Sequence, residues 1–121
     1  MKVVRNVLLG GLLVSMLSVS ASANVDDMSG GSVAIEGITA TPRATVSVDN
    51  GNGQWRYSTS LTLTLKKKVT SDMDHNTKTH KTSCEIDGNK DDSGWVPART
   101  TSRSSATGAR DSVAYANWDV Q

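Results

Sequence analysis

The chain has 121 residues, with 13 basic and 12 acidic side chains, one cysteine and no phenylalanine. This length suits one small domain. The near-neutral charge argues against nucleic acid as a partner and against a simple cationic peptide that disrupts membranes. A single cysteine, Cys84, excludes an internal disulfide, so stability must come from packing, from oligomerisation or from a bridge between two chains.

The first 23 residues have the pattern of a secretory signal peptide. Lys2 and Arg5 precede an apolar run at 7–19, and the small residues at 21–23 follow at the spacing that signal peptidase reads. The run is too short to span a bilayer comfortably, and no second apolar stretch follows it. We therefore expect a cleaved leader over 1–23, secretion to the extracellular space, and a mature chain without a transmembrane anchor. Loss of the two basic leader residues changes the net charge from +1 to −1.

The rest of the chain predicts short strands separated by turns. Residues 24–52 form an N-terminal extension that is partly β, with strand character at 32–38 and 45–48. The Asp-Asn-Gly-Asn-Gly run at 49–53 is the strongest turn signal, because Asn-Gly pairs accept positive φ angles. No later segment has a helical period, so we predict an all-β domain, either a sandwich or a small barrel.

Alternation of apolar and polar residues predicts further strands. Leu61, Leu63 and Leu65 alternate with threonines, and the three lysines at 66–68 are interpreted as a solvated strand end rather than a phosphate-binding patch. Residues 71–79 look like a loop, residues 87–94 like a turn, and residues 95–104 like an edge or bulged strand because they contain a proline.

Two later strands are predicted from the same period. One face of the first carries His80, Thr82, Cys84 and Ile86, which makes Cys84 a buried apolar residue by expectation. The last strand has two faces. One face carries Ala114, Ala116 and Trp118, and the other carries Val113, Tyr115 and Asn117.

Patterns for metal binding and catalysis are weak. Residues 87–98 begin like a calcium loop, but Asp92 and Ala98 stand where that loop needs a glycine and a bidentate glutamate. No Gly-x-Ser-x-Gly elbow exists, and Cys84 has no supporting motif. One cluster of possible zinc ligands matches no zinc spacing: Asp72, Asp74, His75 and His80. We expect no metal, no cofactor and no catalytic residue, and hence no enzyme.

The remaining signal is a set of aromatic and histidine side chains on a β scaffold. Trp and Tyr combine apolar area with a polar tip, which suits sugar-bearing or amphipathic ligands and protein partners. The alternative is that these side chains form the core of a domain that has no phenylalanine. With one lysine, the candidate ligand-binding residues are Trp55, Tyr57, His75, Lys78, His80, Trp95, Tyr115 and Trp118.

Four segments in order resemble the lactococcin-972-type bacteriocins. Gly-Gln-Trp-Arg-Tyr at 53–57 is similar to the opening of that family, and the serine-led segment at 71–82 has its two histidines. Trp-Val-Pro-Ala at 95–98 and the aromatic-rich 114–118 complete the likeness. It covers about 70 residues, from position 53 to the end, and it agrees with the preceding signal peptide.

The resemblance implies a small antiparallel β-sandwich over 53–121 that is exported and forms a homodimer. It also implies an antibacterial protein that binds the cell-wall precursor lipid II and blocks septum formation and peptidoglycan synthesis in related Gram-positive bacteria. On this hypothesis, Trp55, Tyr57, His75, His80 and Tyr115 would hold the sugar and peptide portions, and lysines such as Lys78 and Lys81 would approach the pyrophosphate.

Two other classes remain open. One is a non-toxic extracellular binding module, either wall-associated or adhesin-like. The other is a secreted inhibitor of a foreign hydrolase.

Overall fold

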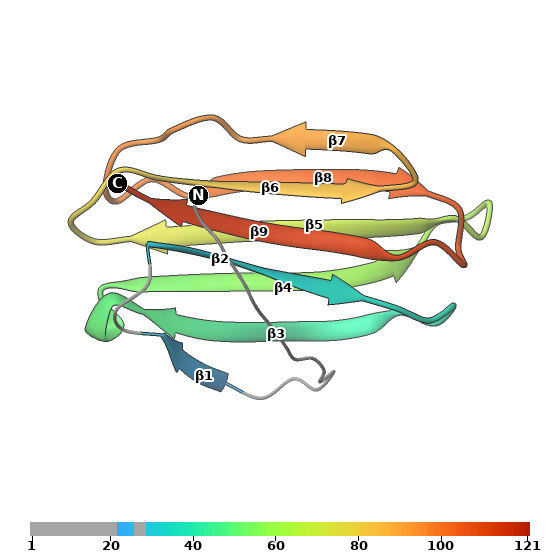
Figure 1. Ribbon diagram of the computed structural model, residues 1–121, viewed down its shortest axis with the longest axis horizontal. Helices are drawn as coiled ribbons and strands as arrows, with labels where there is room; N and C mark the ends of the chain where they lie inside the picture. Colours follow the sequence, from blue (N-terminus) through green and yellow to red (C-terminus); the bar gives the residue numbers. More distant parts are fainter. Residues whose placement is uncertain (1–21, 26–28) are drawn as a thin grey trace.

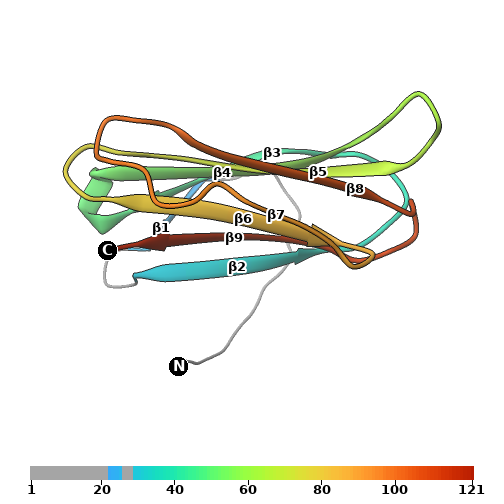
Figure 2. The same ribbon diagram turned by 90° about the horizontal axis from the view of Figure 1, so that it is seen from above.

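The protein folds as two β-sheets packed face to face. The computed structural model describes residues 22–25 and 29–121, which form a five-stranded sheet of order β1-β3-β4-β5-β8 and a four-stranded sheet of order β2-β9-β6-β7. Figures 1 and 2 show the two layers in face and edge views. Apart from Ser22 and Ala23, the leader predicted over 1–23 lies outside the described residues.

Nearly all of the described strand pairings are antiparallel. The parallel pairing of β1 with β3 is the exception. Because all other described pairings are antiparallel, the predicted all-β antiparallel sandwich is confirmed. The five-stranded sheet contains β1 (Ser22–Val25), β3 (Thr41–Val48), β4 (Gly53–Leu61), β5 (Lys67–His75) and β8 (Ser102–Gly108). The four-stranded sheet contains β2 (Gly30–Ile35), β9 (Ala114–Val120), β6 (His80–Ile86) and β7 (Asn89–Asp92).

The predicted N-terminal extension, residues 24–52, contributes strands to both sheets. β2 pairs along β9 near the other end of the chain, and β3 pairs along β4. The turn predicted at 49–53 lies between β3 and β4 as a short 3-10 helix, η2 (Asp49–Gly51). All three of its residues have positive φ angles, which explains the Asn-Gly sequence there.

The core lies between the sheets and is built on two indole rings. Trp55 from β4 and Trp118 from β9 are 4 % and 2 % exposed, and their ring centroids are 6.3 Å apart. The predicted alternation along β6 is confirmed, with His80, Thr82, Cys84 and Ile86 on one buried face. Burial of Cys84 was predicted, whereas His80 was expected on a ligand-binding surface. Burial also raises the pKa of the Cys84 thiol, so this cysteine is an unreactive core residue.

A chain of hydrogen bonds crosses the core from one sheet to the other. The Trp55 Nε1–H group donates to Ser71 Oγ at 2.8 Å, and the Ser71 hydroxyl donates to the Asn117 backbone carbonyl at 3.0 Å. Ser71 lies on β5 and is fully buried, whereas Asn117 belongs to β9. One hydroxyl therefore satisfies a buried indole and links the two layers.

Five of the predicted local structures differ from the observed fold, two of them at the β4–β5 hairpin. The leucine–threonine alternation continues past the end of β4 at Leu61, but residues 62–66 are the turn of the β4–β5 hairpin. Of the three lysines, Lys67 is fully buried rather than solvated, and its Nζ donates to the backbone carbonyls of Ile35 and Gly37. Only Lys66 and Lys68 are exposed.

Strand positions also differ later in the chain. The predicted loop at 71–79 is mostly β5, whose buried face carries the polar residues Ser71 and His75 and so hides the strand period. The predicted turn at 87–94 contains β7, a strand exposed along its whole length. Residues 95–101 are a loop, and the strand expected at 95–104 begins only at Ser102.

Side chains near β7 close one open edge of the sandwich. β8 is the edge strand of the five-stranded sheet. Its Ser105 N–H donates to the Asp91 carboxylate at 2.9 Å, and its Thr107 carbonyl accepts from Asn89 Nδ2 at 2.7 Å. Backbone groups that would otherwise be open to strand addition are therefore capped by the neighbouring sheet.

Replacing Ser71 with alanine should destabilise the fold strongly. The change leaves the Trp55 Nε1–H and the Asn117 carbonyl without their partner, and we expect a loss of about 2–4 kcal/mol in the free energy of unfolding. Chemical denaturation followed by tryptophan fluorescence measures the loss. Ser60→Ala, on the exposed face of β4, is the matched control and should change stability by less than about 0.5 kcal/mol. Equal effects of the two substitutions would contradict the role of the cross-sheet bonds.

Candidate functional site

The eight residues predicted to bind a ligand do not share one surface. Four of them are buried: Trp55, Trp118, His75 and His80. Tyr57 is partly buried and packs against Trp55, with ring centroids 4.7 Å apart. Trp95, Tyr115 and Lys78 are exposed, by 46 %, 44 % and, for the lysine side chain, 48 %. Most of the aromatic set therefore follows the alternative interpretation and forms the core.

His75 is held as a neutral ring. Its Nδ1 accepts hydrogen bonds from the backbone N–H groups of Thr77 and Lys78 at 3.2 and 3.0 Å, so this nitrogen carries no proton. Its Nε2 lies 3.1 Å from the Asp49 carboxylate and is the donor of that bond. Burial lowers the pKa of His75, although the bond to Asp49 opposes the shift.

His80 has a different set of partners. Its Nδ1 is 2.9 Å from the Lys78 carbonyl, and its Nε2 is 2.7 Å from the Thr100 carbonyl. Carbonyl oxygens only accept, so both contacts are hydrogen bonds when both ring nitrogens carry protons. The backbone of His80 also pairs with Val96. This buried ring therefore fastens the loop at 95–101 to the end of the sandwich.

Stability should fall on mild acidification because of His75. The unfolded chain takes up a proton near the usual histidine pKa of 6.5, whereas the folded protein resists it to lower pH. Protons therefore favour the unfolded state in that window, and the free energy of unfolding should drop between about pH 7 and pH 5. Denaturation curves across this range measure the effect.

The matched variant for this effect is His75→Gln. Its side chain keeps a donor and an acceptor but does not titrate, so its stability should depend less on pH over the same range. A variant with the same pH dependence as the parent protein would assign the effect to other groups.

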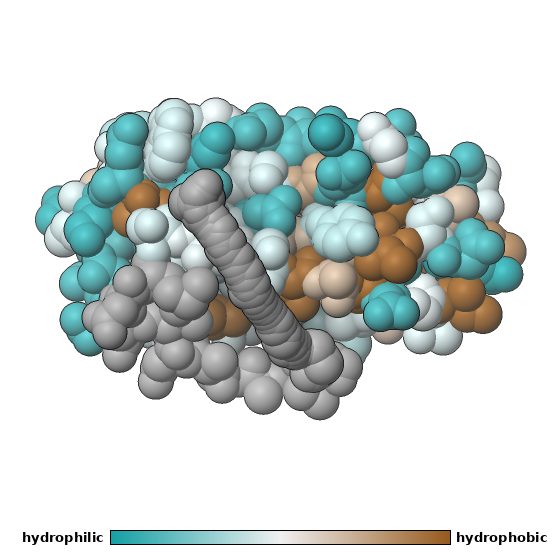
Figure 3. All heavy atoms as spheres, viewed as in Figure 1, coloured by the Kyte–Doolittle hydropathy of each residue, from teal (hydrophilic) through white to brown (hydrophobic). Residues whose placement is uncertain are grey.

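The outer face of the four-stranded sheet carries the exposed aromatic residue Tyr115. Register places Tyr115 of β9 between Ala34 of β2 and Glu85 of β6. One step along β9, Asn117 donates from Nδ2 to Ser83 Oγ at 3.1 Å. Figure 3 shows this face as a mixture of hydrophilic and hydrophobic surface. A flat aromatic ring with amide and hydroxyl neighbours is thus presented to solvent.

A second aromatic group lies over the same sheet. Lys81 Nζ stands 5.1 Å from the centroid of the Trp95 ring and 3.5 Å from an oxygen of Asp92. Lys81 pairs with Asp119 across β6 and β9. Lys81 and Glu85 are four residues apart on β6, which separates the Trp95 and Tyr115 regions by about 13 Å.

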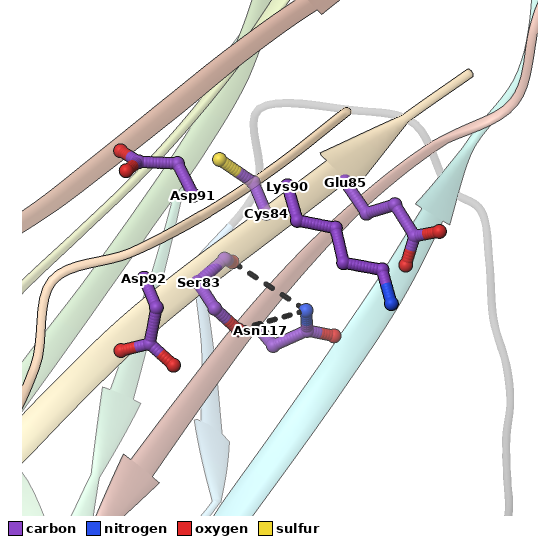
Figure 4. A pocket seen from close by; sticks show the side chains of 7 residues that line it. All are labelled: Ser83, Cys84, Glu85, Lys90, Asp91, Asp92 and Asn117. Atoms are coloured by element: carbon purple, nitrogen blue, oxygen red, sulfur yellow. Dashed lines mark hydrogen bonds between the residues drawn. The ribbon is translucent and has the colours of Figure 1, made fainter. Parts of the chain in front are cut away.

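A shallow pocket lies beside these groups. It has a volume of about 280 Å³ and is lined by Ser83, Cys84, Glu85, Lys90, Asp91, Asp92 and Asn117. Figure 4 shows Asn117 reaching toward Ser83, with the Cys84 sulfur directed away from that pair. The lining offers amide, hydroxyl, carboxylate and ammonium groups, a set that suits a ligand rich in hydroxyl and amide groups.

Sequence reasoning missed the polar part of this surface. Ser83, Glu85 and Asn117 belong to strands whose alternation was predicted, and they occupy the positions opposite the buried face. Their outward-facing positions in that alternation were the sequence signal that could have identified them. Across residues 22–25 and 29–121, no group of three or more His, Cys, Asp or Glu side chains is placed to hold a metal ion.

No family model, no curated protein and no solved structure matches the chain. The likeness to lactococcin-972-type bacteriocins therefore stays a prediction from the four sequence segments. None of the helices in the described part of the chain is long and apolar enough to cross a membrane.

Proposed function

We propose that this is a secreted antibacterial protein that binds lipid II and withholds it from wall synthesis without an enzymatic step. The observation that carries the proposal is the outer face of the four-stranded sheet, where Trp95 and Tyr115 are exposed. The four-segment resemblance supports the choice of ligand and a homodimeric assembly.

The chemistry of this face suits a glycosylated, charged ligand. Aromatic faces stack on sugar rings, and neighbouring amide and hydroxyl groups such as Asn117 and Ser83 exchange hydrogen bonds with sugar hydroxyls and N-acetyl groups. Lys81 is a point charge that suits a pyrophosphate, although it now contacts Asp92. The proposed contact surface therefore narrows from the mixed set of eight residues to its two exposed aromatic members, Trp95 and Tyr115.

Sequestration also agrees with the charge of the chain. The net charge of −1 that remains without the two basic leader residues gives little drive for the pore formation typical of strongly cationic peptides. One protein occupying one precursor molecule is a stoichiometric mechanism, so the amount of protein needed for inhibition should rise with the amount of precursor.

Lipid II binding should depend on the two exposed aromatic residues. Titration with lipid II in detergent should give saturable binding, and Trp95→Ala and Tyr115→Ala should each weaken it about tenfold or more, because stacking anchors carry much of the affinity. Isothermal titration measures the constants, and circular dichroism checks that the variants fold. Ser60→Ala, on the opposite sheet, is the control and should bind like the parent protein.

The outcomes separate the proposed classes. Saturable binding together with inhibition of septum formation supports the bacteriocin. Binding to intact cell walls by a folded, non-toxic protein supports the extracellular binding module instead. Release of dye from vesicles without lipid II would contradict sequestration.

A further inference from the structure

The turn of the β4–β5 hairpin presents leucine side chains to solvent. Leu63 is 104 % exposed and Leu65 is 58 % exposed, and Leu61 at the end of β4 is 38 % exposed. Figures 1 and 2 show this hairpin projecting beyond its neighbouring strands at one end of the sandwich. The sequence pattern that resembled a strand is therefore an apolar tip, formed by residues 61–66.

The tip has a well-defined conformation. The Thr62 N–H donates to the Lys66 carbonyl at 2.8 Å, and the Leu65 N–H donates to the Thr62 carbonyl at 2.9 Å. The Lys66 N–H also donates to Thr62 Oγ1 at 3.1 Å. The leucines are thus held outward by a closed turn.

Leu65 is an unfavourable residue for this turn. Its φ angle is +60°, in the left-handed region where glycine and asparagine are preferred and a bulky side chain is uncommon. Its side chain is more than half exposed, so the fold gains little from its apolar surface. Asparagine at this position would remove both the backbone strain and the exposed apolar surface. The presence of leucine instead indicates that its side chain contacts a partner outside the chain.

Positive charge flanks the apolar tip. Lys66 and Lys68 are exposed, and in the described part of the chain neither forms an ion pair. The lysine between them is engaged inside the fold through Ile35 and Gly37. The β2–β3 loop at the same end adds Ile38, which is 53 % exposed. An apolar tip with two free ammonium groups beside it has complementary chemistry to an anionic lipid surface.

We propose that the tip docks on the surface of a bilayer that contains anionic phospholipids. Leu63 and Leu65 enter the boundary between headgroups and acyl chains, while Lys66 and Lys68 approach the phosphates. A narrow, projecting turn buries too little area for a stable contact between two proteins, which needs roughly 1,000 Å² or more. This docking does not depend on lipid II, and it holds the protein at the membrane without spanning it.

The test uses sedimentation with vesicles that contain no lipid II. The purified protein should bind phosphatidylcholine vesicles with 30 % phosphatidylglycerol (about one lipid in three) and bind pure phosphatidylcholine several-fold less, without releasing trapped dye. Leu63→Ser and Leu65→Asn should each weaken binding about tenfold. Lys66→Gln and Lys68→Gln should weaken it several-fold on the anionic vesicles only.

Two controls keep the result specific. Leu65→Asn removes the strained leucine, so its melting temperature should equal or exceed that of the parent protein while its vesicle binding falls. Arg103→Gln removes one exposed charge near the start of β8, at the end away from the tip, and should bind vesicles nearly as well as the parent protein.

Three outcomes would overturn the proposal. The first is unchanged vesicle binding by both leucine variants. The second is an absence of vesicle binding by the folded parent protein. The third is a change in oligomeric state on leucine substitution without vesicle binding, which would assign the tip to contact between copies. Failure of lipid II binding with normal vesicle docking would count against the proposed ligand alone.

Discussion

The packing of the two sheets depends on two hydrogen bonds of the Ser71 hydroxyl, one to Trp55 in its own sheet and one to Asn117 in the other. A domain without phenylalanine and without an internal disulfide has little surplus stability, and here two indoles supply much of the buried apolar volume. The Trp55 indole brings a polar N–H into the core, where a lost hydrogen bond is expensive. The Ser71 hydroxyl accepts from Trp55, which offsets the cost of burying the indole N–H. The same hydroxyl donates to the β9 backbone and so ties one sheet to the other.

The same solution recurs at the two ends of the molecule. Lys67 is buried at one end with two backbone carbonyls as its acceptors, and the buried His80 ring at the other end has a backbone carbonyl within hydrogen-bond distance of each ring nitrogen. Burial lowers the pKa of Lys67, but the charges of Asp111 and Glu36 oppose this shift. Backbone carbonyls from loops and from the end of β2 thus lie against buried polar side chains, so the positions of these segments depend on the core side chains.

The strand period explains which parts of the fold the sequence predicted. β6 was predicted well because its inward positions follow strict alternation, and β9 was predicted for the same reason. β5 was missed because Ser71 and His75 face inward with their hydrogen bonds satisfied, which removes the apolar signal. The leucine–threonine run gave the opposite error: its alternation is typical of a strand, but the segment after Leu61 is a turn. The pairing of β2 with β9 joins distant parts of the chain, which no local pattern specifies.

The candidate site was predictable only in part. Tryptophan and tyrosine serve equally well as core or as contact residues, so composition did not separate Trp55 from Trp95. Their different exposure follows from the tertiary structure, in which Trp55 faces the opposite sheet and Trp95 follows the exposed edge strand β7. Trp95 and Tyr115 were among the predicted residues, but their polar neighbours were not.

The parallel strand β1 overlaps the end of the predicted leader. Its backbone pairs Ser22 with Thr45 and Ala23 with Val46, so the predicted cleavage point after Ala23 falls in the middle of a paired strand. A peptidase needs an extended substrate that is free of such pairing, so cleavage at that point has to precede the docking of β1. Cleavage there would also shorten the strand to Asn24 and Val25, which would leave Thr45 and Val46 of β3 without their β1 partners and open that edge of the sheet to pairing with another strand.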